Sequence, residues 1–375
     1  MILDSIRLSS LLIPFKVAFK HASAERATTQ TLWVEARSAD GMVGFGEGCP
    51  REYVTGESLR SAQAFVRTHQ REWMATIVDV GTLSDWVARR RGDIDMNPSA
   101  WAAVELAMLD LIGKAGGKSV EALLGLPQLA GSFRYTAVLG DAPPPQFEAQ
   151  LAHYLKAGFS DFKIKLSGDR ARDLAKVRAL SAANIPSRAV RADANNLWGS
   201  ADAALRDLEA LGYPFFALEE PLHPGDYPGM QRLASGLGTR IVLDESLLRA
   251  DQLDRLTGPA DRWIINLRVS KMGGLLRSLE LVREMRQRGL RAIFGAHVGE
   301  TSLLTRAALS VAHTARDILV AQEGGFGTHL LETDLVETPI MFGQGGVLNA
   351  DALGMKSAGF GLTIPLPVPH TTMLG

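Results

Sequence analysis

The first part of the chain changes from a two-residue to a helical hydrophobic period. Residues 31–37 alternate apolar and polar side chains, which predicts a strand, and Ala39-Asp40-Gly41 predicts a turn into a second strand at 42–45. Three later segments carry apolar residues at helical spacing, namely 57–73, 83–91 and 97–111. A hairpin followed by helices predicts an α+β unit, which we place at residues 1–125.

From Gly131 onward, short apolar runs alternate with segments of helical length, which is typical of βα units and a parallel sheet. The runs lie at 134–139, 161–166, 189–193, 215–218, 240–243, 262–267, 291–294 and 318–321. Eight such units favour an α/β fold in which a (β/α)8 barrel of the TIM type occupies residues 126–325. An open, doubly wound sheet is the alternative, but no GxGxxG opens a helix after a strand.

The last segment, residues 326–375, is expected to be extended and to pack back on the first unit. Its final nineteen residues carry no charge, but Pro365, Pro367 and Pro369 would break a membrane-spanning helix. The first twenty residues have the pattern of neither a signal peptide nor a membrane span.

The overall charge is nearly balanced, with 40 Lys and Arg against 41 Asp and Glu. There is no basic field to attract nucleic acid or an anionic membrane, so the expected partner is a small molecule, and a homo-oligomer is left open. Cys49 is the one cysteine, which excludes an intramolecular disulfide and fits a reducing compartment. We therefore expect a cytoplasmic protein.

Polar residues follow four consecutive strands of the expected barrel. They are Lys163 and Lys165, Asp193 with Asn195, Glu219 with Glu220, and Asp244 with Glu245. In a barrel of this type the carboxyl ends of the strands surround the ligand. Three carboxylates meeting there would repel one another unless a cation neutralised them, and oxygen ligands alone favour Mg²⁺, with Mn²⁺ as the alternative.

The two lysines add a base to this expected site. Strand alternation places Lys163 and Lys165 on the same side, where a metal and a second ammonium should lower their pKa values. A single acid at a strand end is more often a helix cap, and a lone Lys-x-Lys is usually a solvated edge. Five such residues at consecutive strand ends nevertheless favour function, whereas Glu220, Glu245 and Lys271 could merely support the others.

Five motifs together carry a resemblance to a known family. They are Lys163-x-Lys165, Asp193-x-Asn195, Leu218-Glu219-Glu220-Pro221, Leu243-Asp244-Glu245-Ser246 and Met272-Gly273-Gly274. In order and spacing they resemble the enolase superfamily, specifically its muconate lactonizing enzyme subgroup, over almost the whole chain. The resemblance implies an α+β capping domain that closes a modified barrel, and a Mg²⁺ ion that holds a substrate carboxylate.

The resemblance also implies a role for each residue of the set. Lys165 would remove a proton next to the carboxylate, with Lys163 as its electrostatic partner. The metal ligands would be Asp193, Glu219 and Asp244. A proton in that position is so weakly acidic that the base needs a cation to stabilise the enediolate.

Arg268 departs from the family pattern. The subgroup usually carries a second lysine there, 24 residues after Asp244, facing the substrate from the other side. A guanidinium stays charged at ordinary pH and is a poor proton carrier but a good clamp for carboxylates. Lys271 could substitute, although its odd spacing from Arg268 would point it away.

His297 is the other candidate proton carrier, because its position resembles that of the histidine in the mandelate racemase subgroup. That histidine normally pairs with an aspartate, which Arg268 replaces, so His297 should be largely neutral near pH 7. Glu300 and Glu323 also follow strands and are expected to position Arg268 or substrate.

One good base opposed by an arginine favours chemistry on one face of the substrate. We therefore expect Mg-dependent α-proton abstraction leading to elimination, such as dehydration, or to cycloisomerisation. An amino-acid or dipeptide racemase or epimerase is the alternative, and a non-catalytic binding protein on the same barrel is a second one.

Overall fold

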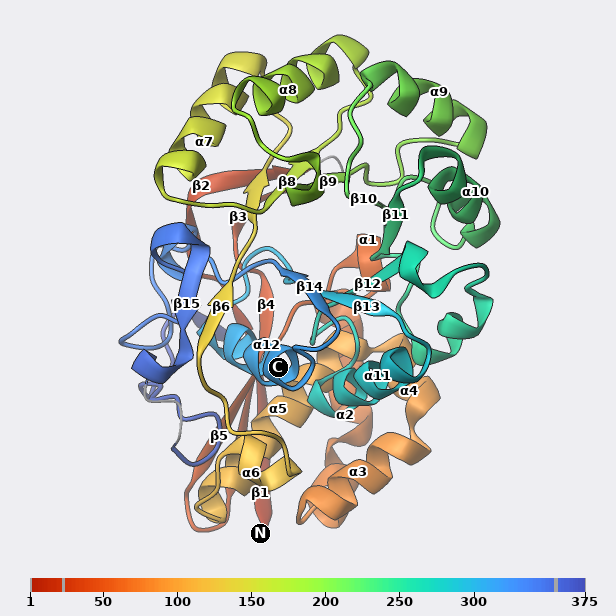
Figure 1. Ribbon diagram of the computed structural model, residues 1–375. Helices are drawn as coiled ribbons and strands as arrows, with labels where there is room; N and C mark the ends of the chain where they lie inside the picture. The colour runs from red at the N-terminus through yellow and green to blue at the C-terminus, as the bar shows by residue number, and fades with distance from the viewer. Residues whose placement is uncertain (1, 22–23, 354–356, 375) are drawn as a thin grey trace.

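The computed structural model describes residues 2–21, 24–353 and 357–374. An antiparallel sheet with helices forms the N-terminal part, and an eight-stranded parallel sheet curls into a barrel beside it (Figure 1). The N-terminal elements are β1 (Leu3–Leu11), β2 (Pro14–His21), β3 (Ala24–Thr28), β4 (Thr31–Ser38), β5 (Val43–Gly48), α1 (Glu52–Thr55), α2 (Leu59–Thr76), α3 (Val80–Arg89), α4 (Arg91–Met96), α5 (Pro98–Ala115) and α6 (Val120–Leu124).

The α-helices and strands that follow α6 are β6 (Ser132–Arg134), β7 (Ala137–Leu139), α7 (Pro144–Lys156), β8 (Phe162–Lys165), α8 (Arg170–Ala182), β9 (Val190–Asp193), α9 (Ala201–Leu211), β10 (Ala217–Glu219), α10 (Tyr227–Leu237), β11 (Arg240–Leu243), β12 (Trp263–Leu267), α11 (Leu275–Gln287), β13 (Arg291–Phe294), α12 (Ser302–Thr314), β14 (Leu319–Gln322), β15 (Val347–Asn349) and β16 (Thr371–Met373). From β7 to β14 strands mostly alternate with helices, as the sequence predicts, although no α-helix lies in the fully described stretch between β11 and β12.

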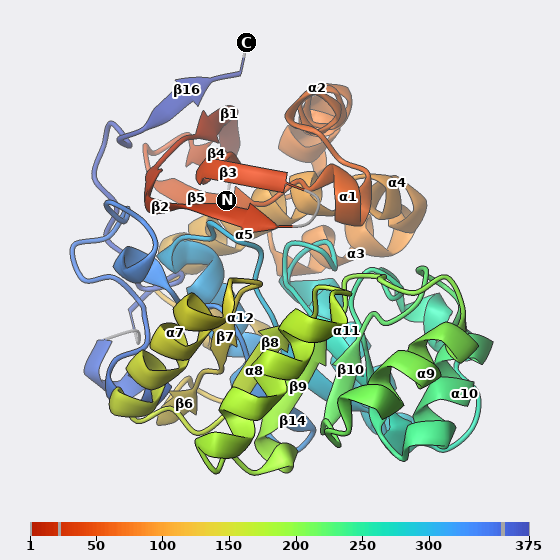
Figure 2. The same ribbon diagram turned by 90° about the horizontal axis from the view of Figure 1, so that it is seen from above.

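The N-terminal sheet has the strand order β16-β1-β4-β5, and the buried helix α5 packs closely against β5. Glycine makes that approach possible, because a Cβ atom on Gly46 would lie 1.9 Å from the backbone oxygen of Ala103 in α5. The hairpin and the helices expected in the first 125 residues are present, with the boundaries given above. In Figure 2 these elements cover one side of the barrel.

The barrel sheet runs in the order β7 to β14, with parallel pairing between neighbours. Just before the first strand, Tyr135 forms a bridge with Gln322 of the last strand, and the Thr136 amide donates to the Gln322 carbonyl at 2.8 Å. The sheet is therefore a curled barrel rather than the open sheet that was the alternative.

The first predicted run, 134–139, is two strands instead of one. β6 pairs with β15, far along the chain, whereas β7 pairs with β8. The chain changes partners at Tyr135, whose amide donates to the Gly346 carbonyl at 2.8 Å. The other seven runs are strands whose ends lie within two residues of the prediction.

The C-terminal segment returns to the N-terminal sheet. β16 runs antiparallel to β1, with Ser10 opposite Thr372. The Val120 amide also donates to the Gly359 carbonyl at 2.9 Å, which ties the segment to α6. No helix in the described part of the chain is long and apolar enough to cross a membrane.

Candidate active site

Strand register brings the predicted residues to one end of the barrel. Lys165 on β8 lies opposite Asp193 on β9, and Asp193 lies opposite Glu219 on β10. Asp244 follows β11 directly and Arg268 follows β12 directly. Because β8 and β12 are separated by three strands of an eight-stranded barrel, Lys165 and Arg268 face each other across it.

Lys163 is a buried ion-pair partner of several acids. Its Nζ donates to Glu323 at 2.5 Å and to Glu219 at 3.0 Å, and lies 3.8 Å from Asp193. Burial alone would lower the pKa of Lys163, but the three carboxylates outweigh burial and raise it. The lowered pKa expected for Lys163 depended on a metal ion beside it, so that expectation stays a prediction. Glu323 holds Lys163, whereas the sequence suggested that it positions Arg268 or substrate.

Lys165 has the properties expected of a base. Its Nζ donates to Asn195 Oδ1 at 3.0 Å and lies 3.8 Å from Asp193 Oδ2. Burial lowers its pKa, and the charges of Lys163 and Arg268 lower it further against the opposing effect of Asp193. Asn195 is fixed in turn by a left-handed backbone, at φ 46°, and by its amide, which donates to Asp193.

Asp244 is paired with two cations. The Arg268 guanidinium donates to its Oδ2, and Lys271 Nζ lies 2.9 Å from its Oδ1. Lys271 is fully buried and also donates to the backbone carbonyls of Asp244 and Asn266 at 2.8 and 2.7 Å. With all three protons of its ammonium engaged, Lys271 supports Asp244 and is not placed to serve as a second base.

Glu220 follows Glu219 in the chain and Glu245 follows Asp244, but the two acids differ in their hydrogen bonds and burial. Glu220 accepts hydrogen bonds from the Asp244 and Ser246 amides at 2.6 and 2.7 Å and from the Ser246 hydroxyl at 2.7 Å. It therefore fixes the loop that carries Asp244. Glu245 is only half-buried, but burial and then the charge of Asp244 raise its pKa to about 9.

Two family models match the chain. The mandelate racemase / muconate lactonizing enzyme N-terminal domain matches residues 6–125, and the enolase C-terminal domain-like model matches residues 146–364, more than half of the chain. The protein belongs to the enolase superfamily. Its place is in the mandelate racemase and muconate lactonizing enzyme group, as the motifs indicate, and it is accordingly an enzyme of this superfamily.

Several relatives are named as epimerases. The chain is 29% identical to the L-Lys-D/L-Arg epimerase of Methylococcus capsulatus over 303 residues, covering 80% of this chain and 82% of that protein. It is 26% identical to the hydrophobic dipeptide epimerase of Enterococcus faecalis over 315 residues, covering 82% and 85%. The crystal structure of a dipeptide epimerase from Methylococcus capsulatus complexed with Mg covers 97% of this chain and 100% of that chain, at 25% identity and a TM-score of 0.78.

The expected metal ligands of this superfamily enzyme are a set of buried oxygen donors. Asp193, Glu219 and Asp244 are each no more than 4% exposed, and burial, together with the neighbouring carboxylates, raises the pKa of Glu219 to about 8. A divalent cation would relieve both the burial and the repulsion, so the chemistry of the donors fits such an ion. Their oxygens do not all lie within 4.8 Å of one another, since Lys163 and Arg268 are bonded among them.

Several groups that hold the site in place carry no local sequence signal. Asn266 donates to Glu219 at 3.1 Å, and Arg191 donates to Asp161 at 3.0 Å and lies 3.4 Å from Glu323. Arg191 lies at the start of β9, and Asp161 lies just before β8. Charged residues at such positions normally face solvent. Their inward position follows only from the closed barrel.

His297 and Glu300 form a second group near Arg268. The His297 side chain is fully buried, and burial, then the charge of Arg268, keeps its pKa below the usual range, as expected for a neutral imidazole. Glu300 accepts from the His297 amide at 2.7 Å, and burial raises the pKa of Glu300 to about 7. Arg51 of the N-terminal part donates to the Val298 carbonyl at 2.8 Å, which fastens that part over this loop.

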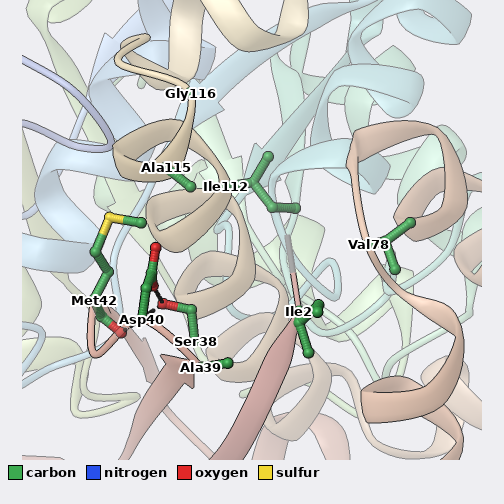
Figure 3. A pocket seen from close by; sticks show the side chains of 9 residues that line it. All are labelled: Ile2, Ser38, Ala39, Asp40, Met42, Val78, Ile112, Ala115 and Gly116. Carbon is green, nitrogen blue, oxygen red and sulfur yellow. Dashed lines mark hydrogen bonds between the residues drawn. The ribbon is translucent and has the colours of Figure 1, made fainter.

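An open cavity of about 500 Å³ lies at the other end of the N-terminal sheet. Figure 3 shows Ser38, Met42 and Ile112 among its lining side chains. β4 begins at Thr31, near the barrel, and ends at Ser38, beside this cavity. The lining contains none of the predicted site residues, so the cavity is separate from the chemistry at the strand ends.

Proposed function

We propose that this enzyme is a metal-dependent racemase or epimerase that removes the α-proton of an amino-acid-derived carboxylate with Lys165. The observation that carries the proposal is the state of Lys165, an amine whose pKa is lowered and which is aimed by Asn195 beside the Asp193 carboxylate. A lowered pKa favours the neutral amine, which is the form that accepts a proton.

Asp193, Glu219 and Asp244 are the proposed ligands of Mg²⁺, with Mn²⁺ as the alternative. The dipeptide epimerase from Methylococcus capsulatus complexed with Mg supports this choice of ion. When bound, the ion supplies positive charge beside the substrate carboxylate, where negative charge develops as the proton leaves. Before Asp244 can bind the ion through Oδ2, Arg268 has to release that oxygen. Lys163 remains bonded to Glu323.

The names of the relatives favour epimerisation over elimination and cycloisomerisation, which were the reactions expected from the sequence. Their names include L-Ala-D/L-Glu epimerase and N-succinyl-L-Arg/Lys racemase, so the proposed substrates are dipeptides and N-acyl amino acids. These names also leave the non-catalytic alternative without support.

Epimerisation requires a second proton carrier on the face opposite Lys165. Arg268 cannot release a proton at ordinary pH, and Lys271 is engaged on all sides. We assign this role to His297, whose neutral imidazole can accept a proton and whose imidazolium would be stabilised by Glu300, 3.6 Å away.

Arg268 is the observation that favours a second candidate function. A fixed cation opposite the base can hold a leaving or developing anion, so elimination or cycloisomerisation on one face is the alternative. The two functions differ in whether both configurations of the α-carbon lose their proton.

The test is solvent exchange at the α-carbon. The Mg²⁺-loaded enzyme is incubated in deuterated buffer with N-acyl amino acids and dipeptides of both configurations, and NMR follows the α-proton. An epimerase exchanges both configurations and interconverts them. Exchange of one configuration with formation of an unsaturated or cyclic product establishes the second candidate, and unchanged exchange in Lys165→Ala contradicts the assignment of the base.

A further inference from the structure

Cys49, His297 and Glu300 form a cluster of metal-type donors that the proposed reaction does not explain as a whole. A sulfur, an imidazole nitrogen and a carboxylate oxygen from these residues all lie within 4.8 Å of one another. Among the described residues this is the one group of three acidic, cysteine or histidine side chains that meets this limit. Cys49 directly follows β5, whereas the other two residues follow β13.

The position of Cys49 is fixed on both sides of its backbone. Its amide donates to the Ser270 hydroxyl at 2.8 Å, and its carbonyl accepts from the Ser99 hydroxyl at 3.1 Å. Ser270 belongs to the barrel and Ser99 to α5, so the thiol is held where the two parts of the molecule meet. Cys49 is completely buried.

The His297 ring points to a ligand. Neither of its nitrogens has a hydrogen-bond partner, although the side chain is fully buried. Leaving a buried polar group without a partner is unfavourable, so buried polar groups normally have one. The thiol and the carboxylate beside it make a metal ion a chemically suitable partner.

The surrounding charges select the kind of ion. Burial first, and then Arg268, Arg51 and other nearby cations, lower the pKa of His297 and favour its neutral form, which is the form of imidazole that binds a metal. The same cations repel a hard ion such as Mg²⁺, which is held by charge alone. A borderline or soft ion forms partly covalent bonds to thiolate and imidazole and depends less on charge.

We propose that Cys49, His297 and Glu300 bind a transition-metal ion of the zinc class at a site distinct from the Mg²⁺ ligands. Binding forms a bond from the ion to Cys49 Sγ, and the thiol proton is released to solvent. Because the ion also takes the free imidazole, it removes the proton carrier assigned to His297, so zinc should inhibit the enzyme. This last consequence alone rests on the proposed function.

The single cysteine makes the site directly testable. Co²⁺ is titrated into the Mg²⁺-saturated full-length protein without substrate, and the near-ultraviolet thiolate-to-cobalt band is recorded. Any such band must come from Cys49. We expect a band that saturates at one equivalent, disappears on adding Zn²⁺, and is absent from Cys49→Ser and strongly reduced in His297→Ala.

Asp193→Asn is the matched control, because it alters the Mg²⁺ ligands and should keep the band. Absence of a band in the wild-type protein, a band unchanged in His297→Ala, or a band lost in Asp193→Asn would each overturn the proposal. Circular dichroism checks that every variant is folded. Since no turnover is measured, failure of the proposed epimerase activity would leave this result unaffected.

Discussion

Arg268 is the residue at which this site differs from the pattern of its family. Its guanidinium is bonded to Asp244, one of the proposed metal ligands, and faces Lys165 across the barrel. A permanent charge there can bind and orient anions, but it cannot exchange protons with the substrate. In the proposed reaction the two faces of the substrate therefore meet side chains of different chemistry.

Lys165→Ala should remove the base. We expect α-proton exchange to fall by about 10²–10⁴-fold, the usual contribution of a general base, with the fold retained. NMR in deuterated buffer measures the rate. Lys156→Ala, on the exposed end of α7, is the matched control and should exchange at the wild-type rate. A rate in Lys165→Ala close to that of the control would move the base elsewhere.

Arg268→Lys should make the two faces more alike. An amine at this position can carry a proton, so the slower-exchanging configuration should gain rate relative to the faster one. The ratio of the two exchange rates, measured on both enantiomers of one substrate, is the readout. Arg268→Met removes the charge without supplying a proton carrier and should not raise the slower rate. Equal ratios in the two variants would mean that proton transfer on this face does not involve residue 268.

The candidate site residues could be selected from the sequence because most of them lie at the end of an apolar strand or just after it. The contacts between these side chains could not be predicted. The contact of Arg268 with Asp244 and that of Lys163 with Glu323 join different strands, so they depend on how the barrel closes. For the same reason no local pattern indicates that Cys49, which comes from another part of the fold, lies beside His297 and Glu300.

At the scale of elements, β8 is held in place by a buried lysine on α8. Lys176 Nζ donates to the backbone carbonyl of Lys165 at 2.7 Å and lies within 2.9 Å of carboxylate oxygens of Asp173 and Asp141. Asp173 in turn accepts from the amides of Ser167 and of the next residue. One ammonium thus connects the helix, the strand end and the loop between them.

Lys176→Met should destabilise the protein strongly, since it leaves the buried Asp173 without its cation. Breaking a buried pair in this way costs about 3–5 kcal/mol of unfolding free energy. Urea unfolding measures the loss. Arg172→Ala removes an exposed pair with the same Asp141, which should cost no more than about 1 kcal/mol. Similar losses in both variants would contradict the role given to Lys176.

The strands were predictable where pairing is local to the βα repeat. From 161–166 onward each predicted run is a barrel strand, because an apolar run followed by a helix is a local pattern. The run 134–139 was not predictable as two strands, because β6 pairs with β15 more than 200 residues later. Nothing in the local pattern marks that change of partner at Tyr135.

At the scale of the molecule, buried acids join the N-terminal part to the barrel. Glu105 on α5 accepts from the amides of Leu275 and Leu276 at the start of α11, at 2.5 and 3.0 Å. Glu47 on β5 accepts from the amide and the hydroxyl of Thr301 at the start of α12, the latter at 2.7 Å. Each acid satisfies helix amides that would otherwise lack partners.

The buried acids Glu47 and Glu105 should make the free energy of unfolding depend on pH. Burial raises the pKa of Glu47 from 4.5 to about 8, despite the opposing hydrogen bonds from Thr301. Between these two values the folded protein binds a proton that the unfolded chain does not, so the contribution of Glu47 to stability is full below pH 4.5 and declines as pH rises towards 8. Glu47→Gln cannot ionise and should flatten this decline.

The test is urea unfolding at several pH values between 4.5 and 8. Glu52→Gln, at an exposed position of the same N-terminal part, is the control. If Glu47→Gln kept the wild-type slope, the pH dependence would have to come from other buried acids, and Glu105 would be the next to substitute, because burial raises its pKa to about 7.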